Sequence, residues 1–123
     1  MRRLAVVLVS LLALAAGRAE AAVVPVSTYC SPSGDLCFGI FRKDGAIHLD
    51  LTTVERYFGR YTLCVAPPAG TRTCKSFPIR RAGAGWASSV RWYRNFPRRG
   101  PGRYVVTWKL AAPLGPSRAF RLR

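Results

Sequence analysis

The most constraining feature of this 123-residue sequence is a series of short alternating runs that begins near residue 23. Within each run, β-branched or aromatic residues recur at every second position, and clusters of Gly, Pro, Asp or Asn interrupt the pattern every eight to twelve residues. Short, evenly spaced strands with such turn signals are typical of β-sandwiches and β-barrels. The sequence therefore predicts an all-β domain. The expected strands cover residues 24–30, 37–42, 46–53, 60–66, 72–79, 88–96, 102–110 and 117–123.

One short helical turn is expected between the third and fourth of these strands. Thr52 and Glu55 have the S/T-x-x-E spacing of a capping box, in which a hydroxyl and a carboxylate satisfy free N–H groups at the start of a helix. No other segment after residue 23 has a helical pattern of convincing length.

The N-terminal residues have the pattern of a secretory signal peptide. Arg2 and Arg3 precede an apolar run over residues 4–16, and small residues surround a cleavage point after Ala21. A membrane-spanning helix needs about 20 apolar residues, so this run is too short to be one. We therefore expect residues 1–21 to be cleaved and residues 22–123 to form a single domain. This domain should be secreted, either extracellular or associated with the cell envelope, without a membrane span.

The charge balance is strongly basic. The whole chain has 20 Lys and Arg against 5 Asp and Glu, and residues 22–123 have 17 against 4, a net charge of +13. Because half of the residues are hydrophobic, the chain is too apolar to be a disordered basic tail. The positive charge must therefore lie on the surface of a folded domain.

Four cysteines, an even number, are expected to form two disulfides in an oxidising compartment. They are Cys30, Cys37, Cys64 and Cys74, for which three pairings are possible. The chain has one histidine and no C-x-x-C pair, so we expect neither a metal site nor a cofactor.

Strand register predicts which residues face inward. Asp44-Gly45 favours a two-residue type I′ hairpin, because both residues tolerate the positive φ that this turn requires. Lys43 then pairs with Ala46, and the apolar residues of both strands fall on one face. These residues are Phe38, Ile40, Ile47, Leu49 and Leu51, while Phe41, His48 and Asp50 fall on the other face.

The same reasoning pairs two of the cysteines. A hairpin whose loop contains Pro67, Pro68 and Gly70 places Cys64 directly opposite Cys74, at a separation close to that of a disulfide. Cys30–Cys37 follows by elimination. In this register Lys75 lies on the inner face, so its ammonium must reach solvent at the edge of the sheet.

The last hairpin predicts a further set of inward residues. They are Tyr104, Val106, Trp108, Leu110, Phe120 and Leu122.

Four stretches of sequence carry a resemblance to known proteins. They read YCSPSGDLCFGIFRKDG, GRYTLCVAPPAGTRTCKSFPI, VRWYRNFPRRGPGRYVVTWK and LGPSRAFRL. Together they resemble a group of small secreted actinobacterial proteins, and Gly102-Arg103-Tyr104 before a Val and Trp strand resembles the closing hairpin of bacterial immunoglobulin-like sandwiches. The resemblance implies an immunoglobulin-like antiparallel β-sandwich of seven or eight strands with two local disulfides. It implies no activity, because a fold does not determine a function.

The basic residues suggest a binding surface. If the strands simply alternate in direction, the loops at residues 43–45, 67–72 and 97–103 share one end of the sandwich. The expected anion-binding residues at that end are Arg42, Lys43, Arg72, Arg98, Arg99 and Arg103. Such a cluster attracts anionic polymers, although an arginine-rich composition that only maintains solubility would look the same. We expect a monomeric, non-catalytic binding or structural module that contacts anionic cell-envelope polymers or an acidic protein.

Other classes of function would require different features. A small-ligand-binding or inhibitor module would need an apolar cleft with a few convergent polar groups. An enzyme would rely on His48 and Asp50 as base and orienting group, but the sequence contains none of the G-x-S-x-G, H-E-x-x-H, P-loop or dinucleotide motifs. Nucleic-acid recognition is not expected, because the strand alternation places Trp92 in the core and leaves only Tyr93 outside.

Overall fold

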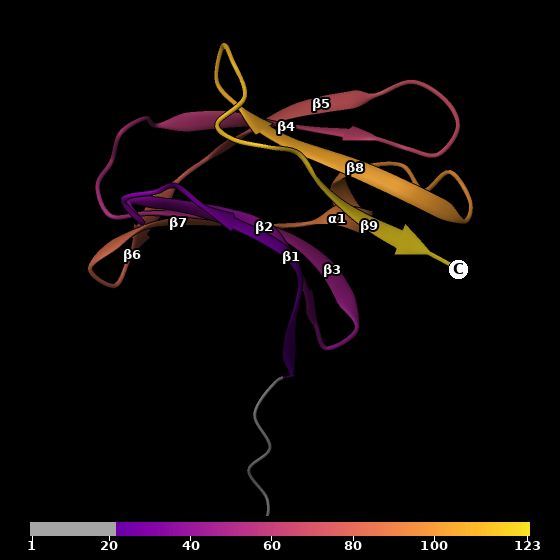
Figure 1. Cartoon of the computed structure of the whole chain (residues 1–123), viewed down its shortest axis with the longest axis horizontal. Coiled ribbons are helices and arrows are strands. Elements are labelled where there is room, and N and C mark those ends of the chain that lie inside the picture. Colours follow the sequence, from indigo (N-terminus) through magenta and orange to yellow (C-terminus); the bar gives the residue numbers. More distant parts are fainter. Residues whose placement is uncertain (1–21) are drawn as a thin grey trace, which may run out of the picture.

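The protein is a sandwich of two antiparallel β-sheets, described here from a computed structural model (Figure 1). The structure describes residues 22–123, so the expected signal peptide over residues 1–21 lies outside the described residues. The elements are β1 (Val23–Cys30), β2 (Leu36–Lys43), β3 (Ala46–Thr53), β4 (Arg60–Ala66), β5 (Thr73–Pro78), β6 (Arg80–Ala82), β7 (Gly85–Arg91), α1 (Trp92–Asn95), β8 (Gly102–Lys109) and β9 (Arg118–Leu122).

The strand order is that of an immunoglobulin-like sandwich with one additional strand. The first sheet has the order β1-β2-β3-β7-β6 and the second has the order β5-β4-β8-β9. If β2 is taken as strand A, these orders become A-B-E-D and C′-C-F-G, which is immunoglobulin-type topology. The additional strand, β1, pairs with β2. The predicted fold class is therefore confirmed.

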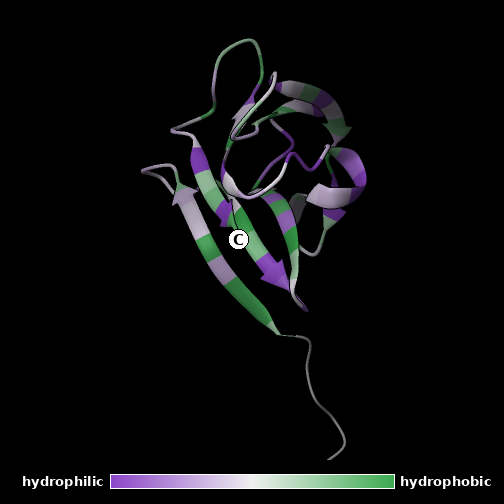
Figure 2. Cartoon of the chain, turned by 90° about the vertical axis from the view of Figure 1, so that its right-hand side faces the viewer, coloured by the Kyte–Doolittle hydropathy of each residue, from purple (hydrophilic) through white to green (hydrophobic). Residues whose placement is uncertain are grey.

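The core lies between the two sheets and is rich in aromatic rings. Trp108, Tyr61 and Tyr104 are its largest fully buried side chains. The Trp108 ring stacks on Phe38 across the sandwich at a centroid distance of 4.6 Å, and Tyr104 stacks on Phe120 at 5.1 Å. Figure 2 shows the resulting alternation of hydrophobic and hydrophilic residues along the strands.

The predicted hairpin registers are confirmed. Lys43 pairs with Ala46, and both turn residues have positive φ, 52° at Asp44 and 84° at Gly45. The five expected inner residues of this hairpin are all buried. Cys64 lies opposite Cys74, and both expected disulfides are present. Two disulfides are compatible with an extracellular protein.

Lys75 behaves as its inner position predicts. It lies opposite Leu63 but is exposed. Its Nζ sits 5.8 Å from the ring centroid of Phe96, a cation–π distance.

Two segments fold differently from the prediction. The strand expected over residues 88–96 ends at Arg91, because α1 follows and the Phe96 N–H donates to the Trp92 carbonyl oxygen over 2.9 Å. This turn begins the crossing from the first sheet to the second, and it still buries Trp92 and Phe96. The helical turn expected after Thr52 is also wrong. The Thr53 hydroxyl instead donates to the Glu55 carbonyl oxygen over 2.6 Å, which fixes a non-helical bend.

The last two differences concern strand ends and strand number. Leu110 is 39% exposed rather than inward-facing, because β8 ends at Lys109. The strand β6 was not expected, since its three residues are all exposed and give no alternating pattern. With β6 the sandwich has nine strands rather than seven or eight.

No helix among residues 22–123 has the length and apolar composition needed to cross a membrane.

Candidate functional site

Four arginines surround a hollow at one end of the sandwich, which we call the arginine end. This end holds the β2–β3 turn, the β4–β5 loop and residues 97–101. In Figure 1 the β4–β5 loop is at the right and the β2–β3 turn is at the bottom, and Figure 2 looks onto this end with the C-terminus near the centre. The hollow has a volume of about 550 Å³. Its lining, which defines the arginine hollow, is Arg42, Arg98, Arg121, Leu122 and Arg123.

Strand periodicity explains why Arg42 contributes to this hollow. Phe38, Ile40 and Arg42 alternate along β2 and therefore face the same side. The first two are buried in the core, whereas Arg42 lies one step further, where β2 reaches the end of the sandwich. Its partner across the hairpin, Ile47, is the last buried residue at this end of β3. The guanidinium group is therefore held where the core opens to solvent.

A buried tyrosine fixes the segment that contains Arg98. The Tyr104 hydroxyl donates to the Gly100 carbonyl oxygen and accepts the Arg99 N–H, each over 2.7 Å. A tyrosine near the start of strand F that binds the preceding backbone is the tyrosine corner of immunoglobulin-like domains. Gly102 packs against the neighbouring loop so closely that a Cβ there would lie 2.8 Å from Pro68. Arg98 therefore projects from an anchored loop.

The arginine hollow has no acidic lining residue. Among residues 22–123 the one ion pair joins Lys43 to Asp50, so none of the four arginines is paired with a carboxylate side chain. The acid closest in sequence is Asp44 in the β2–β3 turn, whose carboxylate accepts the Ala22 N–H over 3.2 Å. Uncompensated guanidinium groups around one concave surface create a positive potential that favours anions.

A smaller hollow of about 180 Å³ adjoins the arginine hollow, with which it shares Arg42 and Leu122. Trp92 and Tyr93 line it, and their rings stack at a centroid distance of 5.8 Å. Tyr93 is 68% exposed, as predicted, while Trp92 is buried. The buried Trp92 N–H has no hydrogen-bond partner among the described residues.

The structure brings together only some of the six residues that the sequence assigned to an anion site. Arg42 and Arg98 line the same hollow. Arg72, Arg99 and Arg103 are exposed at the same end but do not line it. Lys43 does not line this hollow either. It follows Arg42 and so faces the outer side of the sheet, where its Nζ lies 2.7 Å from Asp50 Oδ2.

Arg121 and Arg123 were missed as members of the hollow. Their alternation with Phe120 and Leu122 placed them on the outer face of the last expected strand. Only the long-range arrangement, which sets the end of β9 beside Arg42 of the other sheet, shows that they share a hollow.

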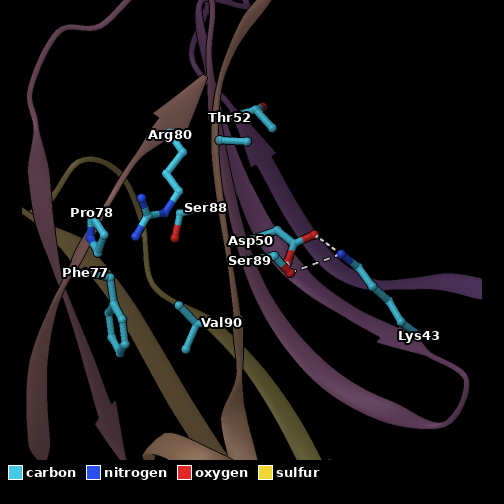
Figure 3. Close-up of a pocket in the computed structure, with 10 residues that line it drawn as sticks. Lys43, Asp50, Thr52, Phe77, Pro78, Arg80, Ser88, Ser89 and Val90 are labelled. Carbon is cyan, nitrogen blue, oxygen red and sulfur yellow. Dashed lines mark hydrogen bonds and ion pairs between the residues drawn. The ribbon is translucent and has the colours of Figure 1, made fainter. Parts of the chain in front are cut away.

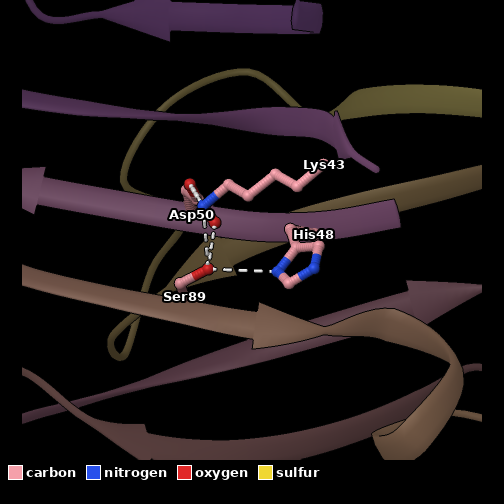
Figure 4. A network of polar contacts seen from close by, with 4 residues as sticks. All are labelled: Lys43, His48, Asp50 and Ser89. Atoms are coloured by element: carbon pink, nitrogen blue, oxygen red, sulfur yellow. Dashed lines mark hydrogen bonds and ion pairs between the residues drawn. The ribbon is translucent and has the colours of Figure 1, made fainter. Parts of the chain in front are cut away.

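A polar network on the outer face of the first sheet includes the two candidate catalytic residues (Figure 4). His48 and Asp50 lie on one face of β3, as predicted, and Ser89 of β7 lies between them. Its hydroxyl donates to Asp50 Oδ1 over 2.7 Å and lies 3.3 Å from His48 Nδ1. The Lys43 ammonium donates to the same hydroxyl over 3.2 Å. Lys43, His48, Asp50 and Ser89 define the polar network.

The proton positions in this network do not suit nucleophilic catalysis. A catalytic serine is activated by a histidine that accepts its proton. Here Asp50 accepts the only proton of the Ser89 hydroxyl, so His48 Nδ1 must donate to Ser89 rather than accept from it. Lys43 is ion-paired and is therefore no base either. The arrangement instead ties together β2, β3 and β7.

The charges around His48 disfavour its protonation. Partial burial lowers the pKa of His48 below its ordinary value of 6.5, because it disfavours the imidazolium. The positive charges of Lys43 and Arg91 lower this pKa further, while the Asp50 carboxylate opposes the shift. His48 is therefore neutral near pH 7.

The polar network borders a hollow of about 460 Å³ that reaches around β7 toward the second sheet (Figure 3). Asp50 and Ser89 line it on one side of β7, and Phe77, Arg80 and Val90 line it on the other. Among residues 22–123, no three His, Cys, Asp or Glu side chains are grouped as metal ligands.

Comparison with known proteins found no matching family model, no matching curated protein and no matching solved structure. The resemblance to small secreted actinobacterial proteins therefore stays a prediction.

Proposed function

We propose that this protein is a secreted, non-catalytic binding module that engages an anionic polymer of the cell envelope at its arginine end. The observation that carries the proposal is the arginine hollow, in which Arg42, Arg98, Arg121 and Arg123 surround one concavity without an acidic partner. The planar guanidinium group donates two parallel hydrogen bonds to phosphate or carboxylate, which makes arginine well suited to such polymers.

Two further features support this assignment. The Tyr104 hydrogen bonds hold residues 99 and 100, so that Arg98 is positioned before a ligand arrives. Pre-organisation of this kind reduces the entropy lost on binding. The polar network supports a non-catalytic role, because the Ser89 proton is directed at Asp50 and not at His48.

The test compares two double variants that change the net charge equally. Arg98→Gln with Arg121→Gln removes two members of the arginine hollow. Arg56→Gln with Arg81→Gln removes two arginines that contact Trp86 instead. Binding of each protein to poly(glycerol phosphate), to double-stranded DNA and to polyglutamate is measured over a salt series.

We expect the arginine-hollow variant to bind poly(glycerol phosphate) at least about tenfold more weakly at physiological salt, with a salt slope smaller by about 2. The control variant should lose about twofold or less. Equal losses in the two variants would show a generic polycation and would overturn the proposal. A preference for polyglutamate would replace the envelope polymer with an acidic protein partner.

The catalytic alternative has its own test. If the polar network were an active site, Ser89→Ala and His48→Ala would each abolish hydrolysis of an activated ester such as p-nitrophenyl acetate. We expect the purified protein and both variants to be indistinguishable from buffer. Turnover that depends on Ser89 would contradict the non-catalytic assignment.

A further inference from the structure

A further concave surface, which shares no lining residue with the arginine hollow, lies on the outer face of β1, β2 and β3. Its volume is about 410 Å³, within the range of small-ligand sites. We call it the sheet-face hollow. The side chains that matter for its chemistry are Pro25, Phe41, the Cys30–Cys37 disulfide, Thr28, Asp50 and Thr52.

A glycine lets β1 pack closely against β2 beside this hollow. Gly39 lies between Thr28 of β1 and Asp50 of β3 in the strand register. A Cβ at this position would lie 2.8 Å from Thr28 Cγ2 and 2.9 Å from the Ser27 carbonyl oxygen. The centre of the face therefore cannot accept a larger residue without displacing β1.

The polar groups that line the sheet-face hollow are held in place, and some of their hydrogen-bonding positions are free. Lys43 contacts one oxygen of the Asp50 carboxylate and Ser89 contacts the other, which fixes its orientation. A carboxylate can accept about four hydrogen bonds, so Asp50 keeps free acceptor positions. The hydroxyls of Thr28 and Thr52 make no side-chain hydrogen bond to another described residue, and both residues are exposed. These groups can exchange hydrogen bonds with a ligand.

The charge of this hollow differs from that of the arginine end. Asp50 is its one charged lining residue, and Lys43 neutralises it at 2.7 Å. On a protein whose residues 22–123 carry a net charge of +13, this face is locally balanced. Charge complementarity therefore favours an uncharged ligand.

The remaining lining sets the shape of that ligand. Phe41, Pro25 and the disulfide give apolar surface beside the carboxylate and hydroxyl groups. A sugar ring matches this combination, because its C–H groups pack against apolar and aromatic surface while its hydroxyls bind the polar groups. The hollow of about 460 Å³ across β3 shares Asp50 and Thr52 with the sheet-face hollow, so two adjacent concavities meet at these residues.

We propose that the sheet-face hollow binds a neutral oligosaccharide, with Phe41 against a sugar ring and Asp50 and Thr52 as hydrogen-bond acceptors for its hydroxyls. The site does not depend on the arginine hollow. Two adjoining concavities that share Asp50 and Thr52 favour a chain of several sugar units over a monosaccharide.

Amide chemical shifts of the purified protein, recorded by NMR during titration with cellotetraose, chitotetraose and maltotetraose, test this proposal. At least one of these tetrasaccharides should shift the amides of Thr28, Phe41 and Thr52 with a Kd on the order of 0.1 to 1 mM. Phe41→Ala should weaken this binding about tenfold. Asp50→Asn, which keeps the shape of the side chain, and Thr52→Val should each weaken it several-fold.

Two controls separate this site from the arginine hollow. Tyr93→Ala removes another aromatic ring, on a different surface, and should leave saccharide binding unchanged. Arg98→Gln with Arg121→Gln should also leave it unchanged, whatever its effect on polymer binding. The proposal would be overturned if none of the three tetrasaccharides shifted these amides at about 10 mM, a concentration at which weak binding is detected. It would also be overturned if Phe41→Ala kept its fold and bound the saccharide as tightly as the wild type.

Discussion

Both ends of the sandwich carry arginines, but the surroundings of these arginines differ. At the arginine end, four guanidinium groups line a hollow without an acidic member. At the opposite end, Arg56 and Arg81 each lie 5.6 Å from the ring centroid of Trp86. At that end, cation–π contacts with Trp86 already stabilise both guanidinium groups. The comparison teaches that the number of positive charges does not define a site, whereas the partners of those charges do.

Removal of the disulfides should give the largest difference between the two ends. Cys64–Cys74 closes the loop at the arginine end, and Cys30–Cys37 closes the short loop at the opposite end. Closing loops of roughly this size contributes about 2 to 3 kcal/mol each. Cys64 is 1% exposed and is the one fully buried half-cystine, whereas Cys30 and Cys74 are exposed and Cys37 is partly buried. Cys64→Ala with Cys74→Ala should therefore cost about 1 kcal/mol more than Cys30→Ala with Cys37→Ala. Unfolding in guanidinium chloride measures both, and equal losses would contradict the expected asymmetry.

The tyrosine corner provides the next test. Tyr104→Phe leaves the Arg99 N–H and the Gly100 carbonyl oxygen without their partner, at a cost of about 2 kcal/mol. Tyr61→Phe is the matched control, because the Tyr61 hydroxyl binds only the Ser88 hydroxyl, which can rotate. We expect a loss of about 1 kcal/mol there. Hydrogen exchange at the Arg99 amide should accelerate only in Tyr104→Phe, and an unchanged rate would show that other contacts hold this loop.

The two groups of arginines should affect stability in opposite directions. Arg42→Gln with Arg121→Gln relieves repulsion between unpaired charges and should raise stability by about 0.5 kcal/mol at low ionic strength. Arg56→Gln with Arg81→Gln removes two exposed cation–π contacts and should lower it by about 1 kcal/mol. Thermal unfolding at low and high salt measures both changes. Only the stabilisation by Arg42→Gln with Arg121→Gln should decrease at high salt, because ions screen the repulsion between exposed charges.

The smallest effect is expected at His48, on the outer face of β3. Its pKa is lower in the folded state than its ordinary value of 6.5, so the unfolded chain binds more protons as the pH falls through that value. The wild type should therefore lose stability relative to His48→Gln between pH 7.5 and 5.5. The difference in melting temperature across this pH range measures the effect. A difference of opposite sign would mean that Asp50 raises the pKa of His48 by more than burial, Lys43 and Arg91 lower it.

Local sequence patterns predicted the parts of the fold that depend on neighbouring strands. The turn residues Asp44 and Gly45 and the alternation around them fixed the β2–β3 register, and the same reasoning paired Cys64 with Cys74. The tyrosine corner was accessible in principle, since Tyr104 follows a Gly and Pro segment at the start of a strand. Each of these features depends only on contacts between residues that lie within about twenty positions of each other in the sequence.

The candidate sites were harder to predict, because their residues are distant in the sequence. Ser89 reaches His48 and Asp50 only through the pairing of β3 with β7. Arg121 and Arg123 reach Arg42 only when the two sheets pack. The alternation of residues along a strand predicts which face each side chain lies on, but it does not predict which distant strand pairs with it. The sequence therefore predicted an arginine-rich end but not which arginines line its hollow.

The location of the disulfides also bears on the order in which the fold can form. Each disulfide joins the two strands of a single hairpin, and neither connects one sheet to the other. In an oxidised but unfolded chain, the strands of one sheet therefore remain free to move relative to those of the other. The pairings of β3 with β7 and of β4 with β8 must close long loops without covalent help, and such contacts are slow to form. We expect the hairpins to be oxidised early during refolding and the packing of the two sheets to limit its rate.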